Sequence, residues 1–303
     1  MQFLALDCLA TTPYFRTPMR TIAHVSDLHF GRLDAPVAEG LVDDLRHRSP
    51  SLLVASGDFT QRARRRQYAQ AATYLKRLPT PQILIPGNHD IPMYDVVRRF
   101  FFPLHRYRQY ITQDLFPSYG DDDMYVLGIN TARSFTQKSG WITREELEIV
   151  QQKMHSQPPG RMRILVTHHP FIPPPRDPKG DIVRGAGDAL AQLEQCGVDL
   201  LLAGHLHLAY HDDVRSRYTA ISRSILSIQA GTATSNRRRG EPNAYNWITI
   251  SPDFVTVAVR AWNGREFAES LVTRYRRTNH VWTRESQLPV DQTIPRSPEK
   301  NGN

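Results

Sequence analysis

The feature that most constrains how this 303-residue chain can fold is a polar motif that follows an apolar, β-branched run at five separate places. Short, continuous apolar runs are typical of buried strands in parallel sheets. Such sheets bind their ligands in the crevice outside the carboxyl ends of the strands. We therefore expect one rim of the fold to gather the five motifs, which are Asp27-Leu28-His29, Gly57-Asp58, Gly87-Asn88-His89-Asp90, His168-His169-Pro170 and Gly204-His205-Leu206-His207.

The residue types in these motifs are those that bind divalent metal ions. Asp and Asn supply hard oxygen donors and neutral imidazole supplies nitrogen, a mixture that suits Mn, Fe, Zn or Co. The motifs contain no cysteine, which argues against a structural zinc site held by thiolates. Two metal ions held by mixed oxygen and nitrogen ligands indicate hydrolysis of a phosphoester.

Together the motifs resemble the signature of the calcineurin-like metallophosphoesterase superfamily, which reads D-x-H, G-D, G-N-H-D, H and G-H-x-H. The resemblance covers roughly residues 21 to 250 and fills every signature position in order. Within the superfamily, the chain is most similar to the class III cyclic nucleotide phosphodiesterase branch. The resemblance implies an α/β fold with two face-to-face mixed β-sheets flanked by helices, and hydrolysis of a phosphodiester such as a cyclic nucleotide.

The resemblance also implies roles for individual residues. Two divalent cations, bridged by Asp58, would activate a hydroxide that attacks phosphorus. His89 would supply a proton to the leaving group, and Asp90 would orient the His89 ring. The ligands implied for the first cation are Asp27, His29, Asp58 and His207, and those implied for the second are Asp58, Asn88, His168 and His205.

A formal net charge of +8 and a pI near 9.6 indicate an anionic partner, here an anionic phosphoester substrate. A helix predicted over residues 62–77 would carry Arg62, Arg65 and Arg66 on one face, at spacings of three and four. We interpret these arginines and His169 as candidates for substrate binding, with a solvated basic face as the alternative. A second cluster, Arg237–Arg239, follows a turn that in the family folds back beside the metal site.

One segment leaves the class of substrate undecided. Residues 96–111 interleave aromatic side chains with arginine, which suits a membrane interface or an acyl-chain groove. The alternative function is a UDP-2,3-diacylglucosamine-type pyrophosphate hydrolase in peripheral contact with an anionic membrane. Otherwise Phe100, Phe101 and Phe102 simply pack their helix onto the sheet.

Two further readings are disfavoured. A nuclease would need an additional region to cap the nucleic acid, and the residues after 250 are too few, so no obligate nucleic-acid partner is implied. A non-catalytic scaffold would have lost metal ligands, whereas this chain keeps all seven.

The predicted organisation is an N-terminal extension over residues 1–18, one metallophosphoesterase domain over 19–282 and a disordered tail over 283–303. Pro, Ser, Asn and charged residues dominate that tail, a composition typical of disorder. Cys8 and Cys196 provide no disulfide framework, and no apolar run reaches the length of a transmembrane helix. We therefore expect a cytoplasmic protein, whose oligomeric state the sequence leaves open.

The pattern of apolar residues predicts the order of the secondary-structure elements. Helices are expected over 36–47, 62–77, 92–110, 143–155 and 187–195. Thr143 and Glu146 form a capping box at the start of the fourth, and Pro103 should break the third. Strands are expected over 21–26, 51–56, 82–86, 123–129, 162–167 and 198–203, followed by antiparallel strands over 207–211, 224–230, 245–251, 253–262 and 267–274.

Overall fold

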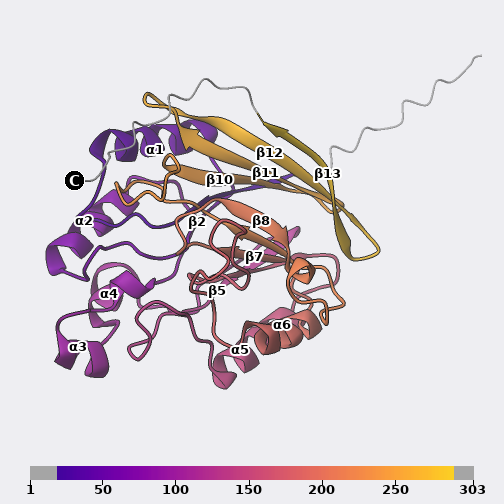
Figure 1. Ribbon diagram of the computed structural model, residues 1–303, viewed down its shortest axis with the longest axis horizontal. Coiled ribbons are helices and arrows are strands. Elements are labelled where there is room, and N and C mark those ends of the chain that lie inside the picture. Colours follow the sequence, from indigo (N-terminus) through magenta and orange to yellow (C-terminus); the bar gives the residue numbers. More distant parts are fainter. Residues whose placement is uncertain (1–18, 290–303) are drawn as a thin grey trace, which may run out of the picture.

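Two β-sheets packed face to face form the body of the molecule, with helices on both outer sides (Figure 1). The computed structural model describes residues 19–289, so the predicted extension over residues 1–18 lies outside the described residues. In spatial order, the strands of the first sheet are β13 (Val281–Pro289), β12 (Phe267–Thr278), β11 (Phe254–Trp262), β10 (Ala244–Ile250), β1 (Arg20–Val25), β2 (Leu52–Ala55) and β3 (Gln82–Leu84). Those of the second are β4 (Ser118–Gly120), β5 (Met124–Gly128), β6 (Met162–Val166), β7 (Leu200–Ala203), β9 (Leu226–Gln229) and β8 (Tyr210–Asp213). The predicted two-sheet α/β architecture is confirmed.

The helices cover the two outer faces and one corner of this sandwich. The α-helices are α1 (Ala35–Arg48), α2 (Arg65–Leu75), α3 (Val96–Phe101), α4 (His105–Tyr110), α5 (Arg144–His155) and α6 (Ala186–Gln195). The short 3-10 helices are η1 (Asn88–Asp90) and η2 (Val214–Ser216). None of the helices within residues 19–289 combines the length and the apolar character that crossing a bilayer requires.

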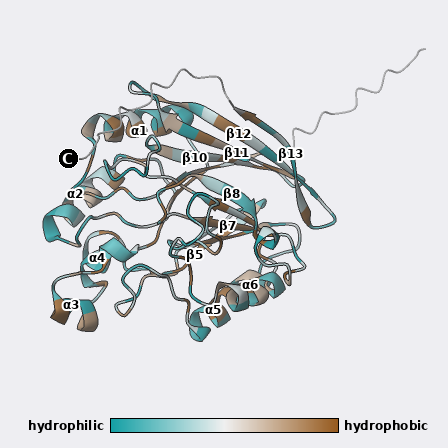
Figure 2. Cartoon of the chain, in the orientation of Figure 1, coloured by the Kyte–Doolittle hydropathy of each residue, from teal (hydrophilic) through white to brown (hydrophobic). Residues whose placement is uncertain are grey.

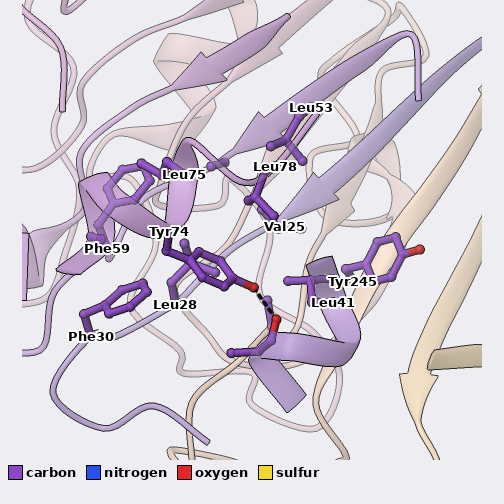
Figure 3. Close-up of a cluster of buried hydrophobic side chains, with 14 of the residues drawn as sticks. Val25, Leu28, Phe30, Leu41, Leu53, Phe59, Tyr74, Leu75, Leu78 and Tyr245 are labelled. Atoms are coloured by element: carbon purple, nitrogen blue, oxygen red, sulfur yellow. Dashed lines mark hydrogen bonds between the residues drawn. The ribbon is translucent and has the colours of Figure 1, made fainter. Parts of the chain in front are cut away.

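Apolar side chains of one strand contribute to separate cores on the two faces of its sheet, because successive side chains of a strand point to opposite sides. In β1, Ile22 belongs to the core between the sheets, whereas Ala23 and Val25 belong to the core under α1 and α2. Figure 3 shows this outer core, where the Tyr74 hydroxyl donates a 2.7 Å hydrogen bond to the carbonyl of Ala38 on α1. A third core lies between the second sheet and α5 and α6.

Strand direction brings the five motifs to one side of the sandwich. β1, β2 and β3 are parallel to one another, as are β5, β6, β7 and β9. The carboxyl ends of neighbouring parallel strands lie at the same edge of a sheet, so the loops that follow them can converge. One predicted direction is wrong, because β9 pairs parallel to β7 and antiparallel only to β8. The chain first runs to the edge strand β8 and then returns between β7 and β8.

The helix predictions hold except at two boundaries. Glu146 N–H donates to Thr143 Oγ1 and Thr143 N–H donates to the Glu146 carboxylate, which confirms the capping box of α5. The stretch predicted over 92–110 divides into α3 and α4 around Pro103. The helix predicted from residue 62 begins only at Arg65, because Gln67 Oε1 accepts from the N–H of Arg62 and holds the preceding residues in a turn.

The domain boundary predicted at residue 282 falls inside β13, which pairs with β12 as far as residue 289. Trp282 is buried, whereas residues 283–288 are exposed. An edge strand with little buried surface has a polar sequence, and backbone pairing with β12 holds it in the sheet. Residues 283–289 are therefore part of the fold, and the remainder of the predicted tail lies outside the described residues.

Candidate metal centre

Turns at the carboxyl ends of β1, β2, β3, β6 and β7 hold all seven predicted ligand residues. Five of the seven have a positive φ, a conformation that costs side-chain-bearing residues energy and is concentrated at functional sites. Gly57 has a φ of 101°, and a Cβ at that position would lie 2.5 Å from His168 Nδ1. The five ligands with positive φ are Asp27 (57°), His29 (47°), Asp58 (55°), His205 (74°) and His207 (59°).

The first predicted ligand set converges around two buried carboxylates. Asp27 Oδ1 lies 3.4 Å from His29 Nε2 and 3.6 Å from His207 Nε2, and Asp58 Oδ2 lies 3.6 Å from the same His29 atom. Neither of these carboxylate oxygens has a hydrogen-bond partner within residues 19–289. A buried, unpaired carboxylate oxygen is costly, and a cation between these four groups would satisfy both.

The second predicted set lies on the other side of Asp58. Asn88 Oδ1 is 3.0 Å from His168 Nε2 and 3.1 Å from His205 Nδ1, and Asp58 Oδ1 is 3.5 Å from His168 Nε2. His168 Nδ1 faces the carbonyl of Ser56 at 2.8 Å, so in a neutral ring the hydrogen is on Nδ1. The Nε2 lone pair then faces the oxygen of Asn88, and two acceptors at this distance also fit a shared cation.

Electrostatics keep both carboxylates in the ionised form that binds metal. Burial alone would raise the pKa of Asp27, but His207 and His29 outweigh it and hold that pKa well below its usual value. For Asp58, burial again opposes ionisation, and His168 and His89 lower the pKa overall. The residue types, the unpaired oxygens and the ionised carboxylates therefore fit divalent metal.

Asp90 makes different contacts from those predicted. Instead of the His89 ring, its carboxylate contacts the backbone N–H groups of Phe59, Thr60 and Gly87, at 3.1, 2.9 and 3.0 Å. Residues 88–90 form the single turn η1, and this turn directs the Asp90 side chain back toward the loop after β2. Burial, and next the charge of Asp58, raises the pKa of Asp90 to about 6. Asp90 therefore clamps together two of the loops that carry ligands.

His89 lies beside an arginine that the ligand motifs did not include. His89 Nδ1 faces the carbonyl of Gln61 at 2.9 Å, so that nitrogen carries the hydrogen, and Nε2 lies 2.9 Å from Arg237 Nη1. Arg237 Nη1 is also 3.5 Å from His29 Nε2. Burial is the largest cause that lowers the pKa of His89, and Arg237 acts in the same direction. The proximity of Arg237 agrees with the position expected for the cluster 237–239.

A pocket of about 410 Å³ opens onto the centre. Ligand residues and His89 form one part of its wall, and basic side chains form much of the rest. Arg239 is paired with Asp177 at 2.6 Å. Lys138 and Lys179 were not predicted, because each is an isolated lysine in a loop without a motif. The basic residues that line the pocket are Lys138, Lys179, Arg237 and Arg239.

None of the four predicted substrate contacts is among the residues that line this pocket. His169 is fully buried, with Nδ1 2.8 Å from Thr131 Oγ1 and its ring 4.4 Å from the His205 ring, behind the second ligand set. Arg65 and Arg66 are exposed at the start of α2. Arg62 precedes the helix and lies over the Tyr94 ring at 5.2 Å, so the three arginines do not share a helical face.

The chain belongs to the calcineurin-like phosphoesterase family, whose model matches residues 20–209. Proteins of this family are phosphoester hydrolases that use divalent metal ions. A probable cyclic nucleotide phosphodiesterase from Synechococcus sp. is 33% identical over 81 residues, which cover 24% of this chain and 32% of that protein. Another probable cyclic nucleotide phosphodiesterase, from Xenorhabdus bovienii, is 24% identical over 208 residues, 67% of this chain and 78% of that protein.

These similarities differ in how much of each protein they span. The alignment with the Synechococcus protein spans about a third of that protein's length. Among solved structures, PhoD superposes with a TM-score of 0.68 at 10% sequence identity, covering 89% of this chain and 72% of the PhoD chain. At that identity, the superposition shows a shared fold.

Proposed function

We propose that the chain hydrolyses a phosphodiester, such as a cyclic nucleotide, at a centre of two divalent cations. The observation that carries this proposal is the position of Asp58 between the two ligand sets. Its Oδ2 atom faces His29 and its Oδ1 atom faces His168, so one carboxylate can serve both cations. The names of the two relatives, both probable cyclic nucleotide phosphodiesterases, support a diester as the substrate.

The ligand sets would divide as the family signature implies. When bound, the two cations supply Lewis acidity, which lowers the pKa of a water and neutralises charge on the phosphoryl oxygens. The protein keeps the ligands ready: Asp90 clamps the loops that carry Asp58 and Asn88, and Asn88 Nδ2 donates to the carbonyl of Gln137 at 3.1 Å. Such contacts fix the orientation of groups that bind metal.

His89 and Arg237 would act on the substrate itself. Because His89 Nδ1 is committed to the Gln61 carbonyl, only Nε2 can exchange a proton with the oxygen of the leaving group. Arg237 is a permanent positive charge beside that atom, and a guanidinium binds phosphoryl oxygens with directed hydrogen bonds. Arg237 would thus hold the phosphate. His89 carries its hydrogen on Nδ1 when neutral, so it would first take up a second proton from water on Nε2 and then pass that proton to the oxygen of the leaving group.

A second substrate class is supported by the two pocket lysines. Outside the ligand set, the pocket wall carries four basic side chains, among them Lys138 and Lys179, against the two carboxylates Asp177 and Asp181. This excess of positive charge favours a substrate with a second phosphate, such as the pyrophosphate of a lipid-linked nucleotide. A single diester phosphate would leave these lysines without a phosphate partner.

The test is a substrate panel with Mn²⁺ and with chelator. It comprises phosphomonoesters, cyclic nucleotides, UDP-2,3-diacylglucosamine and single-stranded DNA. We expect Mn²⁺-dependent turnover that is fastest on a cyclic nucleotide. Preferential turnover of UDP-2,3-diacylglucosamine would select the second class, and preferential turnover of DNA would select a nuclease. Undiminished turnover of every substrate in chelator would contradict a metal-dependent mechanism.

A further inference from the structure

Large apolar side chains are exposed together at the corner of the molecule formed by α3 and the loop before Gly140. Phe101 is 74% exposed and Phe135 is 88% exposed. The rings of Phe100 and Phe135 lie 5.4 Å apart, so the two segments form one surface. Figure 2 colours much of α3 as hydrophobic at the edge of the molecule. This surface, called the α3 patch below, comprises Tyr94, Val96, Val97, Phe100, Phe101, Phe102 and Phe135.

The exposed fractions exclude the reading in which Phe100, Phe101 and Phe102 pack their helix onto the sheet. A polar anchor holds α3 instead. Arg99 is 8% exposed and donates to the carbonyls of Pro92, Ser134 and Thr136, at 3.2, 2.8 and 3.1 Å. The Ser134 hydroxyl donates back to the carbonyl of Arg99. Arg99 therefore fixes both segments, and the aromatic side chains are free to contact another surface.

Positive charge exceeds negative charge in the segment that carries most of the patch. Residues 91–111 contain four arginines and a single carboxylate, Asp95. Arg98, exposed on α3, is paired with Asp95, and Arg99 is the buried anchor. The remaining positive charge lies on Arg106 and Arg108 of α4 and on Arg62, whose guanidinium stacks over the patch residue Tyr94 at 5.2 Å. A second copy of this chain would bring the same positive charge against itself. An anionic surface would be complementary.

We propose that the α3 patch docks the protein onto an anionic lipid bilayer. Protruding aromatic side chains with adjacent arginines suit the interface between lipid headgroups and acyl chains, where the rings enter the apolar boundary and the guanidinium groups meet anionic headgroups. Contiguous exposed apolar surface of this kind marks an interaction site. The short helix lies on the surface and does not cross the bilayer.

Docking would bring the metal centre close to the lipid surface. Residues 133–140 carry Phe135 in the patch and Lys138 in the wall of the pocket. The carbonyl of Gln137, between them, accepts the hydrogen bond that orients Asn88. The proposal does not rest on the hydrolytic function, because docking requires neither metal nor turnover.

The test is flotation of the full-length chain with vesicles in chelator at about 0.1 M salt, where surface charges still act over roughly 10 Å. One set of vesicles contains phosphatidylglycerol and phosphatidylcholine in equal parts, and the other contains phosphatidylcholine alone. We expect binding to the anionic vesicles, weaker binding to the neutral ones, and a decrease as salt is raised. In the double variant Phe101→Ser with Phe135→Ser, binding should fall by about tenfold or more.

The matched control is Leu288→Ser, which removes an exposed apolar side chain (64% exposed) on β13, far from α3 in Figure 1. It should bind vesicles like the unsubstituted chain. Circular dichroism of the double variant checks that its fold is intact. Equal vesicle binding by the double variant, or no binding by the unsubstituted chain, would overturn the proposal. Self-association that the double variant abolishes, without vesicle binding, would show that a second copy occupies the patch.

Discussion

The metal centre and the α3 patch are neighbours, and each reverses the usual distribution of side chains. Polar side chains are buried at the centre, and apolar side chains are exposed at the patch. At the centre, carboxylates and imidazoles are buried, and Asp27 and Asp58 each retain an oxygen without a hydrogen bond within the described residues. At the patch, phenylalanine side chains are exposed. Each arrangement destabilises the free protein. A binding partner would compensate in both places, a cation at the centre and a lipid surface at the patch.

The two regions also differ in what holds them. Left-handed turns and the Asp90 clamp fix the centre, whereas the buried guanidinium of Arg99 fixes the patch. Substitutions at the centre should therefore abolish chemistry and leave vesicle binding intact, and those at the patch should do the reverse. The predictions below test this separation.

The largest effect is expected for Asp58→Ala. Loss of the carboxylate that faces both ligand sets removes a ligand from each cation, so turnover of bis-p-nitrophenyl phosphate should fall below detection. Elemental analysis should find fewer metal ions per chain. The control is Asp43→Ala, which removes an exposed carboxylate on α1. Normal metal content together with normal turnover in Asp58→Ala would rule out the bridging role.

His89→Ala should lower turnover by about 10²–10⁴-fold, the usual contribution of general acid catalysis, while both cations remain bound. The loss should be largest for a ribose alkoxide leaving group, which needs a proton, and smallest for p-nitrophenolate, which does not. Turnover of each substrate and metal content are measured in parallel. An equal loss for both substrates would mean that His89 positions the phosphate instead.

Arg237→Gln should lower kcat/KM by about 10²-fold, since a preorganised donor to the phosphoryl oxygens is lost. Arg238→Gln is a matched control, because Arg238 is the next residue, is exposed and pairs with Asp34 instead of facing the pocket. The control should change kcat/KM little. If both variants behave alike, the contact between Arg237 and His89 has no part in turnover.

Much of the centre could be predicted from sequence because each ligand motif follows directly after the end of a strand. A buried strand leaves a clear apolar run, and the motif after it has a fixed place on the rim. The contacts of Asp90 and the position of His169 could not be predicted this way. They depend on which way a short turn directs a side chain and on residues far along the chain, Phe59 for Asp90 and Thr131 for His169.

The patch and the sheet edges show a second limit of sequence reasoning. An aromatic run predicts a helix with an apolar face, but not whether another element covers that face. Arg99, which resembles a surface residue by its type, is the anchor, and its three partners are backbone carbonyls that carry no sequence signal. The strand β13 was missed for a similar reason. Its sequence is polar, and the groups that pair it with β12 are backbone groups, which leave no sequence signal.

A smaller effect concerns stability in acid. Burial lowers the pKa of His211 to about 4, and this ring also bonds to the Tyr275 hydroxyl at 2.7 Å. The unfolded chain takes up the proton near pH 6.5, so this residue favours unfolding progressively as pH falls from about 6.5 to 4. Between pH 7 and pH 5 the free energy of unfolding should drop by about 2 kcal/mol on this account.

His211→Phe should remove that part of the pH dependence. Urea unfolding of the metal-free chain at pH 7 and pH 5 measures it, and comparing the two drops cancels the titration of other histidines. His24, whose pKa burial lowers to about 3, remains in both proteins as an internal reference. An identical drop in the two proteins would contradict the assigned protonation of His211.

The smallest effect is expected for the double variant Arg65→Gln with Arg66→Gln. Both side chains are exposed at the start of α2, and neither is among the residues that line the pocket at the metal centre. Exposed charges outside the site are screened by salt, so KM for a cyclic nucleotide should change less than about twofold. Arg62→Gln provides the comparison, because Arg62 stacks on Tyr94 in the α3 patch. It should weaken vesicle binding and leave KM unchanged. A strong rise in KM for the Arg65 and Arg66 variant would show that these residues contact the substrate. It would also show that substrate binding is not confined to the metal centre and its pocket.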